Sequence, residues 1–419
     1  MTTAASVPIT VVGLGLLPAV GGDPTPSLPE PYRRAISEAR LLAGGRRLLA
    51  RFPDAPGRRL PLTVPLEPAL AALEAACRRG DAATVLADGD PLFFGIGATL
   101  IRRLGRDAVR ILPGVSSLQE ACARLGLPWH DVICLSLHGR EDLQPLNNAV
   151  GTGRPICLLT DAAHTPDVLA RHLLERGVDW VRMDILENMG DVAERRREMS
   201  PADAVDADFG PACTIILRPV APPRRPLLGL DENLLAVDRR LITKGPVRAA
   251  ALALLRLLPD HTVWDIGAGS GAVALEAAAL AHRGCVVAVE RSAARIADIR
   301  ENRRRCGAAH LELRHGEAPG CLDALPAPDR VFVGGGLSGD AGDAILAAVS
   351  RRLTSGGRVV VSCVLLGTLH RALRFFAAAG WPAEATCVQA AGSAPLAGDI
   401  RLSALNPVFL ISAQKPVEG

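Results

Sequence analysis

One stretch, Val263–Gly271, constrains the fold of this chain more than any other. It reads as an apolar strand that ends at Asp265, then a glycine-rich turn with the spacing Asp-x-Gly-x-Gly-x-Gly, then an amphipathic helix over 272–281. Glycines allow a sharp turn and the close approach of a ligand because they carry no Cβ atom. The free amides of a helix N-terminus attract anionic groups. The stretch therefore predicts a nucleotide-binding unit in a Rossmann-like sheet.

Length and composition indicate a multidomain globular protein. A chain of 419 residues favours two or three domains, and 49% hydrophobic residues can build substantial cores. The net charge is only +3 and aromatic residues make up 3% of the chain. Nucleic-acid binding needs a basic surface, and single strands also need stacking rings. We therefore expect no nucleic-acid partner.

The spacing of the cysteines and the length of the apolar runs predict the compartment of the protein and whether it binds a metal. The ten cysteines are scattered, with no Cys-x-x-Cys pair and no zinc spacing, so we expect buried thiols in a reducing cytosol and no metal site. The first residues carry no basic region, and no apolar run approaches the ~20 residues that span a membrane. The sequence predicts a soluble cytoplasmic protein without a membrane partner.

Strands and helices alternate along the first half of the chain, which favours parallel strands with crossover helices. We expect strands at 9–15, 83–87, 109–112, 132–137, 155–160, 180–187 and 212–217, and helices at 32–43, 67–79, 97–104, 117–125 and 166–176. A Pro/Arg-rich segment, 218–226, cannot be helical and reads as an extended linker. The main domain boundary is predicted there.

The second half repeats the alternation around different motifs. We expect helices at 247–258, 272–281, 293–306, 340–353 and 369–379, and strands at 263–266, 285–290, 311–314, 330–333, 358–365 and 407–413. The sequence thus predicts two unlike α/β modules: residues 1–220, with subdomains at about 7–112 and 113–220, a linker at 221–232, and residues 233–419.

Acidic residues end the two strands after the opening motif. Glu290 ends the next strand, where a carboxylate accepts hydrogen bonds from ribose hydroxyls, and Glu317-Ala318 follows the third. A tight turn without ligand would explain the glycines alone, whereas an NAD site would require a different glycine spacing. Together the motifs resemble the class I S-adenosylmethionine (SAM) methyltransferases. The resemblance implies a SAM site made by Thr243, Asp265, Gly267, Ala268, Gly269, Ser270, Gly271, Glu290, Glu317 and Ala318.

The segment before the first helix of this module, 238–248, should lie over the SAM pocket. Its purely structural interpretation is a helix start with Pro246 in the first turn. Its functional interpretation gives Thr243 to the cofactor and Lys244 and Arg248 to an acidic substrate. With 332–336 and 356–361, the segment resembles the C15-methylating, C12-decarboxylating subunits of corrin biosynthesis.

Three strand ends in the first half carry a second pattern: 12–15, 88–95 and 113–117. Each alone could be a structural turn, but their order and spacing resemble the tetrapyrrole (corrin/porphyrin) methylases, which have two α/β subdomains. The resemblance implies a second SAM site at Gly89, Asp90, Pro91, Ser116, Ser117 and Thr160, and substrate contacts at Gly13 and Gly15. The segment 136–140 is similar to the C5-methylating branch. The first loop departs from the usual Gly-x-Gly-Pro-Gly pattern.

The two modules in this order resemble the decarboxylating C5,15-methyltransferases of cobalamin biosynthesis. The resemblance implies two SAM sites, a precorrin substrate, a homo-oligomer, methylation at C5 and C15, and loss of CO2 from the C12 acetate. A fusion that methylates another substrate, or one with a degenerate regulatory N-terminal half, remains an alternative. His138, His315 and Glu317 are candidates for a general base by position only, and a structural or cofactor-contacting role is the favoured interpretation of each.

Overall fold

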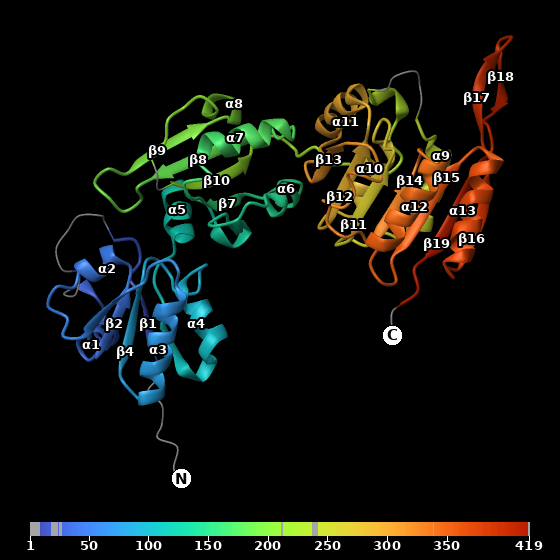
Figure 1. Cartoon of the computed structure of the whole chain (residues 1–419). Coiled ribbons are helices and arrows are strands. Elements are labelled where there is room, and N and C mark those ends of the chain that lie inside the picture. Colours follow the sequence, from blue (N-terminus) through green and yellow to red (C-terminus); the bar gives the residue numbers. More distant parts are fainter. Residues whose placement is uncertain are drawn as a thin grey trace. The chain divides into compact units, whose positions relative to one another are not determined.

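The computed structural model describes residues 9–17, 24, 27–210, 213–236, 242–337 and 339–417. The chain divides into two compact units (Figure 1). The first unit comprises residues 1–141, 154–170 and 182–218, and the second comprises 142–153, 171–181 and 219–419. Within the described ranges, no helix has both the length and the apolarity that crossing a bilayer requires.

The first sheet is entirely parallel, with strand order β3-β2-β4-β1-β5. Its strands are β1 (Ile9–Gly13), β2 (Leu41–Gly44), β3 (Arg58–Pro61), β4 (Ala83–Ala87) and β5 (Val109–Leu112). Its helices are α1 (Glu30–Ser37), α2 (Arg46–Ala50), α3 (Glu67–Arg79) and α4 (Ile96–Leu104). Apolar residues of α3 and α4 pack on one face and those of α1 and α2 on the other. This three-layer arrangement explains why β1 and β4 are apolar on both faces.

The prediction of one helix over residues 32–43 is wrong. Helix α1 ends at Ser37, and β2 begins at Leu41 and pairs with both β3 and β4. The amide of Arg40 already donates to Ala82 O at 2.8 Å, which starts the ladder. The apolar spacing fits a helix, but burial on both sides inside a parallel sheet overrides that local pattern.

The second sheet is mixed, with strand order β6-β7-β10-β8-β9. It contains β6 (Ile133–Ser136), β7 (Ile156–Leu159), β8 (Val181–Glu187), β9 (Arg195–Met199) and β10 (Cys213–Pro219). Helices α5 (Ser117–Leu125), α6 (Gln144–Val150), α7 (Pro166–Glu175) and α8 (Pro201–Ala204) belong to the same part of the chain. β6 and β7 are parallel, whereas β10 runs antiparallel to β7 and β9 antiparallel to β8. The sequence did not predict β9, because an arginine-rich edge strand lacks the apolar pattern of a buried one.

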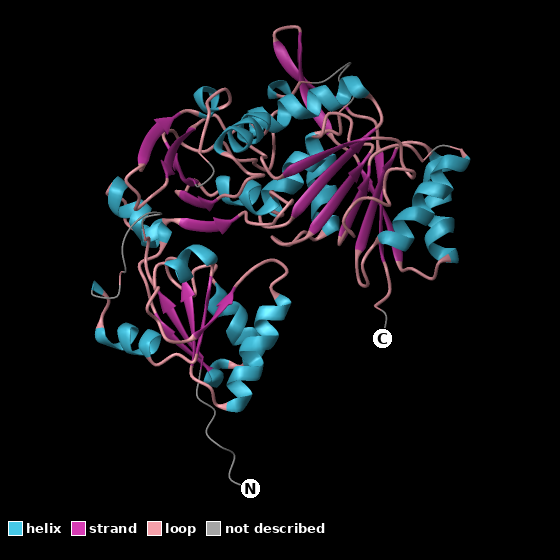
Figure 2. Cartoon of the chain, turned by 60° about the vertical axis from the view of Figure 1, so that its left-hand side comes forward, coloured by secondary structure: helices cyan, strands magenta, loops and turns pink. Residues whose placement is uncertain are grey.

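The C-terminal sheet has strand order β13-β12-β11-β14-β15-β19-β16, and Figure 2 shows helices on both of its faces. Its strands are β11 (Thr262–Ile266), β12 (Cys285–Glu290), β13 (Leu311–His315), β14 (Arg330–Val333), β15 (Arg358–Cys363), β16 (Ala383–Val388) and β19 (Val408–Gln414). One core contains residues of α9 (Gly245–Leu255), α10 (Ala272–Leu280) and α11 (Ala293–Cys306). The other contains residues of α12 (Asp340–Arg352) and α13 (Leu366–Ala378). The α/β class predicted for both modules is confirmed, with the five strands β11 to β15 parallel and β19 antiparallel to β15 and β16.

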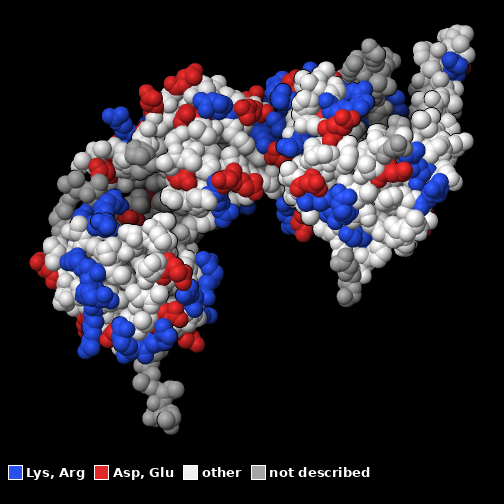
Figure 3. All heavy atoms as spheres, viewed as in Figure 1, with Lys and Arg blue, Asp and Glu red and all other residues white. Residues whose placement is uncertain are grey.

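A two-stranded hairpin, β17 (Ala391–Leu396) and β18 (Asp399–Ala404), extends from the C-terminal sheet (Figure 1). Its turn residues Ala397 and Gly398 have φ values of 48° and 83°, as a tight two-residue hairpin turn requires. Ile400 and Leu402 are 71% and 75% exposed. The hairpin is mostly white in Figure 3, whereas acidic and basic side chains intersperse elsewhere on the visible face of the C-terminal unit.

Candidate active sites

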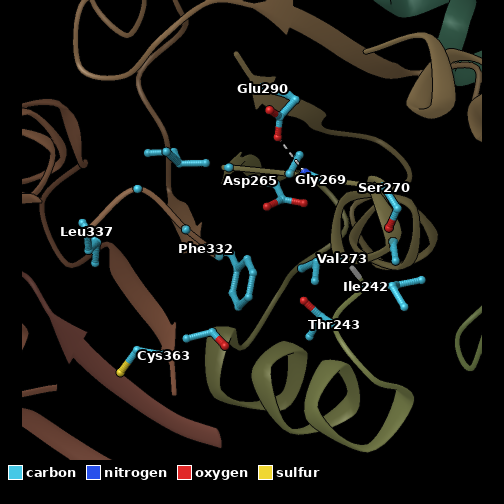
Figure 4. Close-up of a pocket in the computed structure, with 18 of the residues that line it drawn as sticks. Ile242, Thr243, Asp265, Gly269, Ser270, Val273, Glu290, Phe332, Leu337 and Cys363 are labelled. Atoms are coloured by element: carbon cyan, nitrogen blue, oxygen red, sulfur yellow. Dashed lines mark hydrogen bonds between the residues drawn. The ribbon is translucent and has the colours of Figure 1, made fainter. Parts of the chain in front are cut away.

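A cavity of about 1070 Å³ lies at the carboxyl ends of β11, β12, β14 and β15. Ligand sites of open α/β sheets occupy this edge. Nine of the ten residues predicted to bind SAM in this module line the cavity: Thr243, Asp265, Gly267, Ala268, Gly269, Ser270, Glu290, Glu317 and Ala318. In Figure 4, Asp265, Thr243 and Phe332 surround the same space. The sequence motifs therefore meet in one place in the fold.

The glycine loop has the backbone that its sequence predicts. Gly267 has φ +73°, and a Cβ there would lie 3.1 Å from the amide nitrogen of Gly335 in the neighbouring loop. Gly269 has φ +60°, a conformation that side chains rarely adopt. Gly271, the tenth predicted residue, does not line the cavity; it is the N-cap of α10, and a Cβ there would meet Ile299 at 2.8 Å. Glycine is therefore needed at this position for packing against Ile299 and not for the close approach of a ligand.

Glu290 is 3% exposed and is held in place by two backbone amides. Gly269 N donates to Oε2 at 2.9 Å and Ser292 N donates to Oε1 at 3.0 Å, and Figure 4 marks the first of these bonds. Each carboxylate oxygen retains a lone pair toward the cavity. A fixed pair of acceptors is the group that ribose hydroxyls require.

Asp265 carries a buried carboxylate that is only half satisfied. Its Oδ2 accepts from the amide of Ala274 at 3.0 Å, whereas Oδ1 is buried without a partner. Burial raises the pKa of Asp265 to about 7; the Ala274 amide opposes that shift and the negative charge of Glu290 adds to it. An unpartnered carboxylate oxygen beside a cavity suits a cationic group such as the ammonium of SAM. The residues of this cavity therefore fit that cofactor.

Lys244 lines the cavity, but Arg248 does not. The guanidinium of Arg248 is fully buried, and its Nε donates to Glu276 at 2.8 Å. Its Nη1 donates to the carbonyl of Thr243 and to Glu232, and its Nη2 donates to the carbonyl of Leu230. The structure thus gives Arg248 an internal network and not the direct substrate contact expected from the sequence. Asp238 and its successors to residue 241, part of the same predicted segment, lie outside the described residues.

Of the two general-base candidates of this module, Glu317 lines the cavity and His315 does not. Glu317 is exposed and lies 3.3 Å from the guanidinium of Arg291. His315 is also exposed, and its Nε2 lies 3.1 Å from the carbonyl oxygen of Arg291. Neither shares a hydrogen bond with the buried carboxylates of the cavity. The exposed position of Glu317 on the lining favours contact with the outer edge of a bound ligand.

Sequence reasoning missed the outer wall of this cavity. The wall carries the cations Arg291 and Arg295, the polar side chains Ser362, Thr368 and Asn406, and the exposed apolar residues Val364 and Leu365. The apolar pair after β15 continues the apolar run of that strand in the sequence, and only the structure shows that Val364 and Leu365 are exposed. The polar residues come from segments far apart in sequence and form no motif.

A second cavity, of about 610 Å³, lies within the first unit. Ser117 and Thr160 line it, as the sequence predicted for the N-terminal cleft, and so does His138, a general-base candidate. The charged residues Arg47, Asp88, Asp161 and Asp191 also line it, and Arg47 lies 3.0 Å from Asp88. The cleft thus combines charged groups with an apolar lining that includes Leu159, Leu186 and Met189. Thr160 is fixed by a 2.8 Å bond to the carbonyl of Cys213.

The predicted glycine contacts of this module form a junction between three loops. Gly89 N donates to Gly15 O at 2.8 Å, and a Cβ on Gly13 would lie 2.5 Å from Gly114 N and 2.7 Å from Pro91. Gly13, Gly15, Gly89, Asp90 and Pro91 are absent from the lining of the 610 Å³ cavity. Glycine is required here because the backbones touch one another.

Asp90 and Ser116 have structural partners. Asp90 accepts from Leu92 N at 2.8 Å and from Gly114 N at 3.2 Å, so it joins two of the loops. Ser116 is the N-cap of α5 and forms a capping box with Gln119. Both side chains shape the loops around the cleft, and direct cofactor contact by either stays a prediction.

Asp161 holds the other side of the cleft. It accepts from the amides of Gly139 at 2.9 Å and Ala163 at 3.0 Å, and from the ring of His164 at 2.8 Å. The Gly139 amide, foremost, holds the pKa of Asp161 well below its usual range. Asp161 therefore stays ionised and ties the loop that carries the exposed His138 to the end of β7.

Comparison with known families matches each module separately. Residues 19–198 match the family described as Tetrapyrrole (Corrin/Porphyrin) Methylases, and residues 235–415 match the Precorrin methyltransferase domain. A Salmonella typhimurium protein named cobalt-precorrin-7 C(5)-methyltransferase is 39% identical over 210 residues, which cover 50% of this chain and 98% of that protein. Another from the same organism, named cobalt-precorrin-6B C(15)-methyltransferase (decarboxylating), is 36% identical and covers 44% of this chain and 95% of its own length.

Relatives that combine both modules are similar over most of their length. A Sinorhizobium protein named precorrin-6Y C(5,15)-methyltransferase (decarboxylating) is 33% identical over 361 residues, which cover 85% of this chain and 84% of that protein. The similarity spans both family domains and the boundary between them. The chain therefore belongs to the family of decarboxylating precorrin-6Y C(5,15)-methyltransferases.

Proposed function

We propose that the chain is a bifunctional SAM-dependent methyltransferase of cobalamin biosynthesis. It converts precorrin-6B to precorrin-8 by methylating C5 and C15 and removing the C12 acetate carboxyl group as CO2. The N-terminal module performs the C5 step, and the C-terminal module performs the C15 step and the decarboxylation. Ten unpaired cysteines support a reducing, cytoplasmic setting.

One observation carries the division of labour. A relative named for C5 methylation alone and a relative named for C15 methylation alone each match about half of the chain, at 50% and 44% coverage. The separate cavities of 610 Å³ and 1070 Å³, each within one compact unit, support two SAM sites.

The residues of the C-terminal cavity supply positioning and charge. SAM supplies an electrophilic methyl group on a sulfonium. Asp265 and Glu290 are placed to hold the ammonium and the ribose, and Thr243 to meet the carboxylate of the same cofactor. Positioning of two reactants in this way contributes up to ~7–11 kcal/mol to a rate.

The outer wall suits a flat, acidic substrate. Val364 and Leu365 offer an exposed apolar surface, and Lys244, Arg291 and Arg295 place cations on the cavity lining for side-chain carboxylates. Apolar surroundings also raise the free energy of an unpaired carboxylate, which favours its loss as CO2. The electron pair left behind is accepted by the substrate's own ring system.

The hairpin supports a homo-oligomer. Ile400 and Leu402 share one face of β18, and Pro395 lies opposite Ile400 on β17, so that face is apolar and exposed. Exposed apolar ribbons of this kind pack against other protein surfaces. We propose a second copy of the chain as the partner.

The full-length protein tests the function directly. Incubation with precorrin-6B and excess SAM should give a product with two added methyl groups and one lost CO2, as read by mass spectrometry. Calorimetric titration should find two SAM equivalents per chain. A product with one methyl group, or a single binding equivalent, would contradict the assignment of an active site to each module.

A further inference from the structure

One buried cation, Arg248, bonds the backbone at Leu230 and at Thr243, a residue that lines the C-terminal cavity. We propose that Arg248 is a positioning residue for the C-terminal cofactor site, because its guanidinium fixes the segment that brings Thr243 and Lys244 to the cavity. This inference rests on the proposed SAM site and goes beyond it by naming the residue that holds Thr243 and Lys244 at that site.

The geometry of Arg248 carries the proposal. Its Nη1 donates to the carbonyl of Thr243 at 2.6 Å and its Nη2 to the carbonyl of Leu230 at 2.8 Å. Its Nε donates to Glu276 at 2.8 Å, and Glu276 also accepts from the amide of Leu230 at 3.0 Å. One planar cation thus joins two parts of the segment to α10, the helix that follows the glycine loop.

Glu232 extends the network to the cavity lining. It accepts from Lys244 Nζ at 2.8 Å, from Gly245 N at 3.0 Å and from Arg248 at 3.4 Å. Lys244 and Thr243 both line the cavity, whereas Arg248 does not. The orientation of two cavity residues therefore depends on a cation that does not itself line the cavity.

Burial makes the arrangement costly to lose. Arg248 has 0% and Glu276 2% of the side chain exposed, and removing one member of such a pair leaves an uncompensated buried charge. Arg248 also stands in the first turns of α9, where the helix dipole disfavours a cation. The carboxylates of Glu276 and Glu232 offset both costs. What the buried cation then contributes is the connection of the backbone at Thr243 and Leu230 to α10.

A second anchor acts on the same segment. The buried Asn302 accepts from Ala236 N at 2.6 Å and donates to Ala236 O at 2.9 Å and to Ser270 O at 3.0 Å. Ser270 belongs to the glycine loop and lines the cavity. The segment is thus bonded to the cofactor loop on one side and to α10 on the other.

The test uses SAM binding by the full-length chain. Gly269→Asp, which removes the C-terminal site, defines the titration of the N-terminal site alone. The double variant Arg248→Met/Glu276→Gln leaves no unpaired buried charge and keeps an acceptor for Leu230 N, so we expect wild-type circular dichroism and thermal unfolding. We expect its C-terminal SAM affinity to fall about tenfold or more, through the lost bonds of a displaced Thr243. The KM for SAM in the C15 step should rise accordingly, while the C5 step is unchanged.

Two further variants keep the outcome decisive. Arg248→Lys retains the charge but cannot bridge both carbonyls, so an intermediate affinity is expected even if the double variant fails to fold. Arg303→Met removes another buried arginine of the same module, one that bonds Leu311 O and Glu175 O, and should leave SAM affinity unchanged. Wild-type affinity in a folded double variant or in Arg248→Lys, or an equal loss in Arg303→Met, would overturn the proposal. Two SAM equivalents in Gly269→Asp would instead contradict the proposed C-terminal site.

Discussion

The amide of Gly269 donates to the carboxylate of Glu290 at 2.9 Å, across the tips of two adjacent parallel strands. The bond links the turn after β11 to the end of β12, so the glycine loop and the Glu290 carboxylate hold each other in place. A change in either residue alters the position of the other.

Gly269→Asp should abolish C15 methylation and decarboxylation and leave C5 methylation intact. The residue has φ +60°, and the new carboxylate would stand beside Glu290 and Asp265, where like charges repel. The product mass should show one added methyl group and no loss of CO2.

A matched control, Gly380→Asp, separates the effect of backbone strain from the loss of the C-terminal site. Gly380 also has a positive φ, +70°, in the same module, and a Cβ there would meet nothing within 4 Å. Gly380→Asp should leave both methylations at the wild-type rate. If it behaved like Gly269→Asp, the effect at Gly269 would be general destabilisation.

Asp265→Asn should change how stability depends on pH. Burial raises the pKa of Asp265 to about 7, from an ordinary value near 4. Between about pH 4 and pH 7 the unfolded chain gives up this proton before the folded chain does, so this group makes the free energy of unfolding fall as the pH rises. The variant lacks that term, so its stability relative to wild type should improve by up to roughly 4 kcal/mol from pH 4 to pH 8. Denaturant unfolding without SAM measures it, and a difference that is constant with pH would contradict the buried titration.

Asp90→Ala should slow the C5 step by roughly tenfold to hundredfold without affecting the C15 step, because displaced loops misplace the reactants. Asp90 accepts from the amides of Leu92 and Gly114 and so joins two loops of the N-terminal junction. Asp90→Asn keeps one acceptor oxygen and should retain most of the activity. Product analysis of the full chain checks both variants, and full C5 activity in Asp90→Ala would show that the junction does not need this side chain.

Ile400→Glu combined with Leu402→Glu should dissociate the proposed oligomer. The two side chains share the exposed apolar face of the hairpin, and a buried glutamate pair would repel its counterpart. Arg401→Glu alters the opposite face and serves as the control. Sedimentation velocity should report a smaller species for the double variant alone, and equal sedimentation of all three proteins would exclude the hairpin as the interface.

Local signals predicted the strand ends and the glycine loop well. The positive φ values of Gly267 and Gly269 follow from a spacing that only glycine satisfies, and Glu290 stands where the next strand must end. Such features depend on a few consecutive residues and on the rule that parallel strands end at one edge of the sheet.

Tertiary partners set the features that the sequence could not predict. Arg248 turns inward because Glu276 and Leu230, distant in the sequence, accept its hydrogen bonds. Asp90 and Ser116 occupy motif positions, yet a loop brace or helix cap has the same composition as a cofactor contact. Residues 41–44 have helical spacing, and only their pairing with β3 and β4 makes them a strand. In each case the deciding contact is absent from the local sequence.

The position of β19 (Val408–Gln414) has a consequence for the order of folding. This strand lies between β15 and β16 and bonds to both, so the last described strand of the chain is an interior one. Chains leave the ribosome N-terminus first, and the first sheet has all five of its strands by Leu112. The C-terminal sheet cannot close until residues 408–414 emerge. A message truncated before Val408 would therefore yield a folded N-terminal sheet joined to an incomplete C-terminal one, and such a chain would expose its cavity wall to proteolysis during synthesis.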